Sequence, residues 1–211
     1  MLNTKLIKQV FIILTLSFAF LLFVGCATSE TALNQDDIRY ADTKALIEDK
    51  KKSSSNSVSM DVFYTTNGVI RIEVEALLGY QLGSLLMNKN QIQYILYPQK
   101  TFVQGPFAGR TLKPLFKTEI DPRWIEAAIL DTDLTTLGFI CLQKNPELKV
   151  CQSELAEVSV ETKKSPLKKI IIENDEMKFI WVFKSIQKHK KSYNETFVLS
   201  KPEEYRLITI K

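Results

Sequence analysis

A β-hairpin signal in the first third of the chain constrains the fold more than any other feature. Two runs in which apolar and polar residues alternate, 58–64 and 70–76, flank the pair Asn67-Gly68. Both residues tolerate the positive φ angles of a tight turn, so the pattern predicts a two-stranded hairpin. The second run is the clearest strand of the sequence, with one buried and one solvated face.

Further alternating segments predict more strands, and a helical stretch interrupts them. Apolar residues at helical spacing between Thr111 and Leu130 predict one or two short helices, with Asp121-Pro122 as a helix start. Lys188 to Lys191 is interpreted as a solvated hairpin tip. Strands, a helical insert and more strands predict an α+β domain over residues 58–211. The further strands are expected at 83–87, 91–97, 102–104, 167–172, 177–183, 196–200 and 205–211.

The N-terminus has the pattern of an exported lipoprotein. Two lysines precede an apolar run, Val10 to Val24, which ends at Gly25-Cys26. Phe23 to Cys26 resembles the lipobox of bacterial lipoproteins, in which the cysteine becomes the lipidated first residue. Residues 1–25 are then a signal peptide and Cys26 the site of lipid attachment. The alternative is an uncleaved anchor, although the run is shorter than the roughly 20 apolar residues of a spanning helix.

Residues 26–57 are predicted to be a polar tether between the lipid and the domain. The tether ends in a run of lysine, serine and asparagine from Lys50 to Ser57, which is typical of a linker. Within it, Ile38, Ala41 and Ala45 share one helical face, as in a short amphipathic helix that docks on the domain. A disordered spacer is the alternative.

Two cysteines remain once Cys26 is assigned to lipid. Cys141 and Cys151 flank Asn145-Pro146, a turn signal, in a chain that is expected to be exported. A disulfide between them is the favoured interpretation, because such bonds persist in oxidising compartments. Two free, buried thiols are the alternative.

Motifs for catalysis or metal binding are absent from the sequence. His189, the single histidine, stands among lysines, a poor place for a buried general base. No glycine-rich phosphate loop, nucleophile motif or metal-ligand spacing is present. The formal charge of +4 is too small for a dedicated nucleic-acid binder. We therefore expect no enzyme, no cofactor, no metal and no nucleic-acid partner.

The stretch from Val69 to Leu86 resembles the region around the Leu-Gly turn of LolB-like outer-membrane lipoproteins. The segments at Gln93-Tyr94 and Phe102 to Gly105, the helical stretch with a tryptophan, and the C-terminal rhythm from Phe197 are similar too. This resemblance covers residues 58–211. It implies an unclosed antiparallel β-barrel, a half-barrel with helices that cover its concave face. Three departures are a front that is one strand or hairpin short, a helical region that ends in Ile129-Leu130-Asp131 where the family usually has a glycine, and the cysteine loop.

The resemblance also implies a ligand, a partner and a membrane contact. In the family the cavity holds lipoprotein acyl chains, which come from the periplasmic carrier LolA and are placed in the outer membrane. The family's exposed loop leucine corresponds to Leu78, with Leu77 beside it; the alternative is that both end the core of their strand. The residues expected to line the cavity are Ile70, Ile72, Val74, Phe179 and Trp181.

The leading hypothesis is a monomeric lipoprotein of the bacterial outer membrane that faces the periplasm and binds acyl chains or a lipidated client. Ala27, in place of Asp, agrees with the outer membrane under the sorting rule that the resemblance implies. The other hypothesis is a structural or assembly lipoprotein that binds a protein partner through a sheet edge or the helical face. A continuous apolar pocket of several hundred Å3 would favour lipid handling, and a filled core would exclude it.

Overall fold

The structure is a computed structural model, and it describes residues 38–76, 78–116, 118–164 and 167–211. The predicted signal peptide, Cys26, Ala27 and Leu77 lie outside the described residues. The strands are β1 Ile38–Asp49, β2 Ser54–Thr65, β3 Ile70–Glu75, β4 Gln81–Met87, β5 Gln91–Leu96, β6 Thr101–Pro106, β7 Ile140–Asn145, β8 Leu148–Gln152, β9 Glu157–Lys164, β10 Leu167–Glu173, β11 Met177–Lys188 and β12 Arg206–Thr209. The helices are α2 Gly109–Phe116, α3 Pro122–Leu130, α4 Tyr193–Thr196 and the 3-10 helix η2 Leu134–Leu137.

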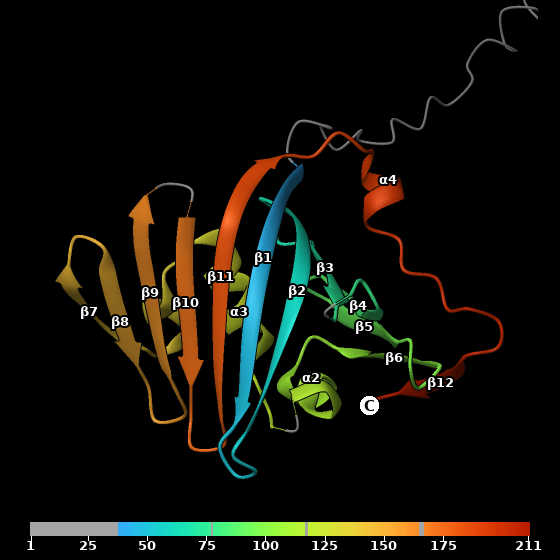
Figure 1. The fold of residues 1–211 in the computed structure, drawn as a ribbon, viewed down its shortest axis with the longest axis horizontal. Helices are drawn as coiled ribbons and strands as arrows, with labels where there is room; N and C mark the ends of the chain where they lie inside the picture. The colour runs from blue at the N-terminus through green and yellow to red at the C-terminus, as the bar shows by residue number, and fades with distance from the viewer. Residues whose placement is uncertain (1–37, 77, 117, 165–166) are drawn as a thin grey trace, which may run out of the picture. The chain divides into compact units, whose positions relative to one another are not determined.

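All these strands belong to one sheet, whose order is β12-β6-β5-β4-β3-β2-β1-β11-β10-β9-β8-β7 (Figure 1). Neighbouring strands are antiparallel, except that β12 pairs parallel with β6. Its two edge strands, β12 and β7, do not pair with each other, so the sheet is unclosed. With helices inserted between β6 and β7, the predicted α+β class and open antiparallel sheet are confirmed. In the described part of the chain, no helix has the length and apolar character to cross a membrane.

The predicted tether is wrong from Ile38 onward, because these residues form β1. This strand pairs with β2 from Ile38↔Thr65 to Asp49↔Ser54, and with β11 on its other side. Its buried residues Ala41, Thr43 and Ala45 alternate at the period of a strand. The spacing of Ile38, Ala41 and Ala45 fits a helix equally well, and pairing with two neighbours decides the outcome. The linker-like run after Asp49 forms the β1–β2 turn and the start of β2, so β1 supplies the strand that the front of the domain lacks.

The helical insert folds as predicted. Asp121 caps α3, since its side chain accepts a hydrogen bond from the backbone N–H of Arg123, and Pro122 occupies the first turn. Trp124 and Ile125 are buried beneath the sheet, and the Trp124 ring packs edge-on against Phe139 at 5.4 Å. The apolar stripe of α3 is therefore core, which agrees with the packing interpretation of this segment.

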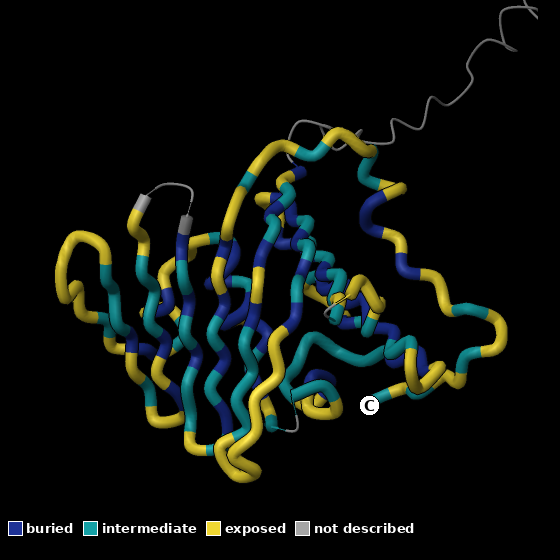
Figure 2. Tube along the Cα trace, in the orientation of Figure 1, coloured by how far each residue is buried: buried dark blue, intermediate teal, exposed yellow. Residues whose placement is uncertain are grey.

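The C-terminal part differs from the prediction in two places. Lys188 to Lys191 is no hairpin tip, because it leads from β11 into α4. The strand predicted at 196–200 is also wrong: a capping box between Ser192 and Glu195 starts α4 instead, and an irregular segment follows. Phe197 and Leu199 of that segment are buried in a second cluster against β4, β5 and β6. Figure 2 shows buried and exposed stretches alternating along the segment from α4 to β12.

The cysteine loop is a β-hairpin of β7 and β8, and the structure joins Cys141 to Cys151 by a disulfide directly across this pair. Cys151 is fully buried. The neighbouring strand β9 is one that the sequence analysis does not predict. The disulfide therefore cross-links the two strands of the hairpin at the β7 edge of the sheet.

We expect the double substitution Cys141→Ser/Cys151→Ser to lower the free energy of unfolding by about 2–3 kcal/mol. Without the cross-link, the unfolded chain has more conformational entropy. Urea unfolding of the variant measures this difference. The native protein treated with a reductant should unfold at the same midpoint as the variant. Equal stability of the oxidised and reduced forms would contradict the structural role of the bond.

Candidate functional site

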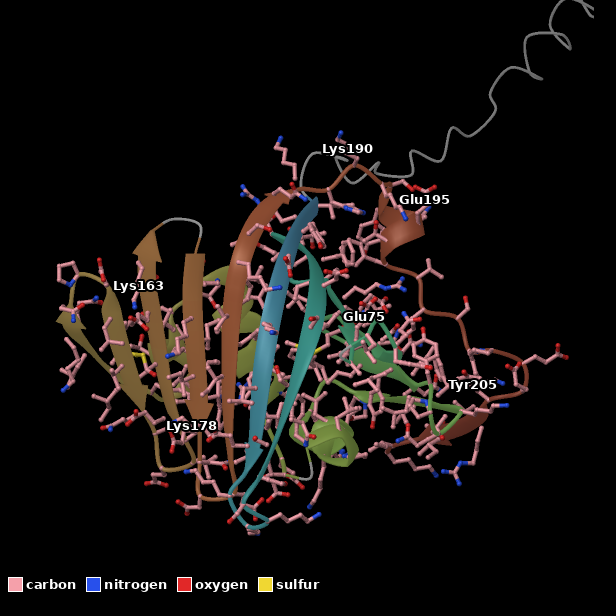
Figure 3. All side chains as sticks on the ribbon, viewed as in Figure 1. Glu75, Lys163, Lys178, Lys190, Glu195 and Tyr205 are labelled. Carbon is pink, nitrogen blue, oxygen red and sulfur yellow. A yellow bond between two sulfur atoms is a disulfide. The ribbon has the colours of Figure 1, made fainter. Side chains whose placement is uncertain are left out.

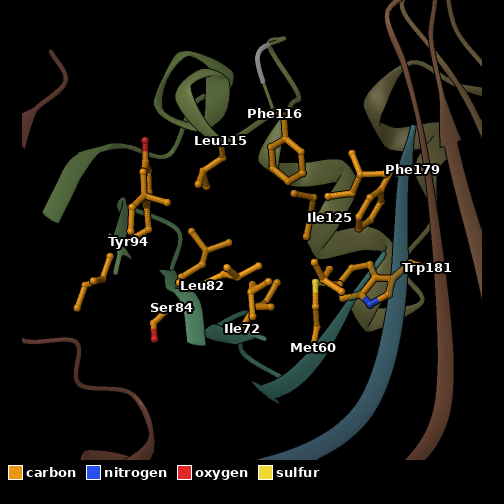
Figure 4. Close-up of a pocket in the computed structure, with 17 residues that line it drawn as sticks. Met60, Ile72, Leu82, Ser84, Tyr94, Leu115, Phe116, Ile125, Phe179 and Trp181 are labelled. Atoms are coloured by element: carbon orange, nitrogen blue, oxygen red, sulfur yellow. The ribbon is translucent and has the colours of Figure 1, made fainter. Parts of the chain in front are cut away.

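An apolar cavity of about 230 Å3 lies between the sheet and helices α2 and α3 (Figure 4). Five strands from β1 to β5 line it together with β11, and Leu115, Phe116 and Ile125 face it from the helices. The complete lining is Ile47, Val58, Met60, Ile72, Val74, Leu82, Gly83, Ser84, Leu85, Tyr94, Ile95, Leu96, Leu115, Phe116, Ile125, Phe179 and Trp181.

The polar side-chain atoms of this lining already have partners. Tyr94 donates its hydroxyl to the carbonyl of Thr111 at 3.2 Å, and Trp181 Nε1 donates to Thr43 Oγ1 at 2.8 Å. The Ser84 hydroxyl bonds Glu73 and Tyr97. Burial also raises the pKa of Tyr94 to about 12, so its phenol stays neutral. The cavity thus offers a ligand apolar surface alone, which suits a hydrocarbon chain and penalises a polar substrate.

Four of the five residues predicted to line the cavity do so: Ile72, Val74, Phe179 and Trp181. Ile70 does not line it. That residue has no exposed surface and pairs with Tyr64 and Met87 at the other end of β3. The alternation of apolar and polar residues predicts the face of β3 on which Ile70 lies. It does not predict which part of that strand borders the cavity.

The sequence analysis missed most of the helical wall. Leu115 and Phe116 lie in the stretch from Thr111 to Leu130 that is predicted to be helical, for which no role in the cavity is predicted. In the structure the Phe116 ring packs edge-on against Phe179 at 6.1 Å, which in turn contacts Trp181 at 5.6 Å. Because α2 and β11 are far apart in the sequence, no local pattern could show that these rings meet.

The lining residues lie toward one end of the sheet. They come from the last residues of β1, β3 and β5 and the first residues of β2, β4 and β11. In an antiparallel sheet these positions share an end, here called the cavity end. Figure 3 shows Lys178, near the start of β11, at this end and Lys190, beyond the end of β11, at the opposite one. Ile38, the first described residue, lies at the Lys190 end, since His189 donates its N–H to the Ile38 carbonyl.

A loop between β3 and β4 presents Leu78 to solvent. The Leu78 side chain is 94% exposed and Tyr80 is 73% exposed. Hydrogen bonds from Ala76 N to Tyr80 O and from Gly79 N to Ala76 O close the loop at 2.8 and 3.2 Å. Leu78 adopts a φ of 78°, a conformation that is unfavourable for a side chain with a Cβ. The alternative that Leu78 ends the strand core is therefore wrong.

The Leu78 loop rises directly from the rim of the cavity. Val74 of β3 and Leu82 of β4 flank the loop, and both line the cavity. An apolar tip and an apolar chamber are therefore separated by only a few residues of chain.

Lys168 holds α3 in place behind the cavity. Its ammonium group is buried and donates hydrogen bonds to the carbonyls of Ala128 and Ile129 at 2.8 and 3.0 Å and to Asp131 Oδ1 at 2.9 Å. A cation at a helix C-terminus interacts favourably with the helix dipole. Burial lowers the pKa of Lys168, although Asp131 opposes this change.

His189 lies far from the cavity, at the Lys190 end. Its ring packs against Phe63 at 4.8 Å, and burial, with Lys191 nearby, lowers the pKa of His189. Within the described ranges, no group of three histidine, cysteine or carboxylate side chains could hold a metal ion.

No protein-family profile matches the sequence, and no curated protein sequence matches it. Among solved structures, the chain is similar to an uncharacterized conserved protein from Thermus thermophilus, at 9% identity and a TM-score of 0.49, over 86% of this chain and 94% of that one. It is also similar to a LolA superfamily protein from Nitrosomonas europaea, at 8% identity and a TM-score of 0.42, over 81% and 93%. A third similar structure, from Vibrio parahaemolyticus, is described as an outer membrane lipoprotein-sorting protein domain, at 8% identity and a TM-score of 0.39, over 80% and 94%.

Proposed function

We propose that this protein is a lipoprotein of the bacterial outer membrane that binds acyl chains, or the acyl part of a lipidated client, in its apolar cavity. The observation that carries this proposal is the lining, whose polar atoms are already hydrogen-bonded. The cavity of about 230 Å3 is larger than the roughly 150 Å3 that accepts benzene in an engineered protein. It is smaller than sites for drug-sized ligands, which supports one acyl segment and not several chains.

Lipid insertion into the outer membrane is the finer part of the proposal. Cys26 would hold the domain at the membrane through its lipid, after removal of residues 1–25. One acyl anchor gives marginal association, and a second apolar contact makes association stable. The exposed Leu78 supplies such a contact, and a LolA-like carrier in the periplasm would supply the client.

Binding is tested with the full chain in lipid vesicles and a brominated fatty acid, which quenches tryptophan fluorescence on contact. Trp181 lines the cavity and Trp124 does not. We expect saturable quenching of the part of the tryptophan emission that comes from Trp181. A chain that shows no saturable quenching does not bind acyl groups in this cavity.

The role in lipoprotein insertion is tested by depletion in the native host, followed by membrane fractionation. Outer-membrane lipoproteins should then accumulate in the inner membrane or the periplasm. The native gene should restore their distribution, and a Cys26→Ser form should not. Normal fractionation after depletion would remove the insertion role and leave acyl binding as a separate question.

A protein partner at the sheet edge is the second candidate function. On the edge strand β7, Ile140 and Leu142 are 77% and 58% exposed, and exposed apolar edges favour pairing with another strand. The double substitution Ile140→Lys/Leu142→Lys would then remove cross-links to that partner in cells. Cross-linking that persists at its native level would exclude β7 as the docking edge.

A further inference from the structure

A second cavity, with a polar lining, adjoins the apolar one at the cavity end of the sheet. It measures about 370 Å3 and lies beside the β1–β2 turn and the end of α2. Figure 1 shows α2 next to this turn. The two cavities share three lining residues, Ile47, Leu115 and Phe116. These apolar side chains therefore form the boundary between the inner chamber and the outer one.

The outer cavity has charges of both signs. Glu48 and Lys52 line it, and Lys51 forms an ion pair with Glu176 across it. Just beyond, Lys50 pairs with Glu173 at 2.9 Å. This surface can hydrate or hydrogen-bond a polar group, whereas the inner chamber has no free polar atom in its described lining. The lining therefore changes from apolar to polar at the three shared residues.

We propose that the outer cavity is the mouth of the acyl site, and that it holds the polar end of a single-chain amphiphile. The acyl chain then passes between Ile47 and the end of α2, and its methyl end lies deeper, toward Tyr94 and Leu96. This assignment rests on the proposed acyl binding and adds to it the route and the direction of the chain. An amphiphile placed in this way leaves its polar end in water and buries hydrocarbon alone.

Three neighbouring residues of β2 make the route testable. Asn56 is paired with Ile47, so its side chain is on the same face of the sheet and lines the mouth. Val58 is on that face too, inside the apolar cavity. Ser57, between them, is paired with Leu46 and points to the opposite face. A phenylalanine at 56 therefore obstructs the mouth, and the same residue at 57 does not.

The experiment measures fatty-acid exchange by stopped flow, with the full chain in vesicles and Trp181 quenching by the brominated fatty acid as the signal. Asn56→Phe should slow both association and dissociation at least tenfold. Ser57→Phe should change neither rate. If Asn56→Phe exchanged the fatty acid at native rates, the outer cavity would not be the mouth of the acyl site. Binding of the fatty acid by the native chain would still support the acyl site itself.

A second variant pair avoids any effect on folding. Asn56→Cys and Ser57→Cys proteins are folded first and then labelled with a bulky maleimide. Slow exchange after labelling at 56, with fast exchange after labelling at 57, supports the mouth. Equal rates at both positions overturn it. Failure of the native chain to bind the fatty acid at all would overturn both the mouth and the proposed acyl site.

Discussion

The double substitution Val58→Phe/Ile72→Phe is expected to weaken acyl-chain binding about 100-fold. Both residues line the apolar cavity and are at most 8% exposed. Each ring would displace roughly two methylene groups of the ligand, and burial of one methylene group contributes about 0.8 kcal/mol. Two rings then remove about 3 kcal/mol of binding free energy, and each 1.4 kcal/mol is a factor of ten. Quenching of Trp181 by the brominated fatty acid gives the affinity.

The control for this prediction places the same ring outside the cavity. Ser57→Phe adds a ring on the opposite face of β2 and should bind the fatty acid with native affinity. Urea unfolding should show that the double variant remains folded, because its rings enter an empty volume. If the folded double variant binds as tightly as the native chain, the acyl chain occupies some other place.

Leu78→Glu is expected to abolish insertion of the β3–β4 loop into lipid and to fail in restoring lipoprotein distribution after depletion. The exposed leucine gains about 1.5–3 kcal/mol when it leaves water for an apolar phase, whereas an ionised carboxylate opposes that transfer. The equilibrium constant for insertion of the β3–β4 loop into lipid should fall at least tenfold. Tyr80→Trp, two residues away and 73% exposed in the native chain, provides a fluorescent reporter. Its quenching by brominated lipids should be strong with Leu78 and weak with glutamate at that position.

A matched control separates the loop from a general loss of apolar surface. Leu142 of β7 is also exposed, at 58%, and lies outside the Leu78 loop. Leu142→Glu should leave the quenching of the Tyr80→Trp reporter unchanged. Equal quenching in the Leu78→Glu and native forms of the reporter would show that the loop stays in water.

Local patterns predict the elements that local chemistry determines. The turn after β2, the alternation of β3 and the Asp121 cap of α3 are all readable within a few residues, and the structure contains each of them. The prediction of a tether over β1 is wrong because the apolar residues of β1 fit both the helical period and the strand period. The pairing of β1 with β11, between 128 (Asp49↔Met177) and 149 (Arg39↔Lys188) positions later in the chain, selects the strand. The capping box at Ser192 was a readable signal that the interpretation of 196–200 as a strand overlooked.

The cavity could be predicted only in part. Ile72, Val74, Phe179 and Trp181, four of the residues expected to line the cavity, do line it. Whether an inner-face residue meets a void or a neighbour depends on packing between distant elements, which is why Ile70 was misplaced. The exposure of Leu78 could not be predicted from the sequence either. A leucine at the end of a strand core and a leucine at the tip of a loop are equally consistent with the same residues.

On the proposed lipid anchor at Cys26, the early start of β1 would shorten the segment between lipid and domain. Cys26 and Ile38 are 12 positions apart, and an extended chain covers at most about 3.3–3.6 Å per residue, so a lipid on Cys26 allows a reach of about 40 Å. β1 has 12 residues and, at about 3.3 Å each, is itself about 40 Å long.

Such a segment would join the domain at the start of β1, and Leu78, between β3 and β4, lies toward the opposite end of the sheet. A domain that stands upright on its lipid would therefore hold the loop away from the bilayer, facing an arriving carrier. Because the extended segment reaches about as far as β1 is long, the proposed anchor would still allow Leu78 to reach the membrane.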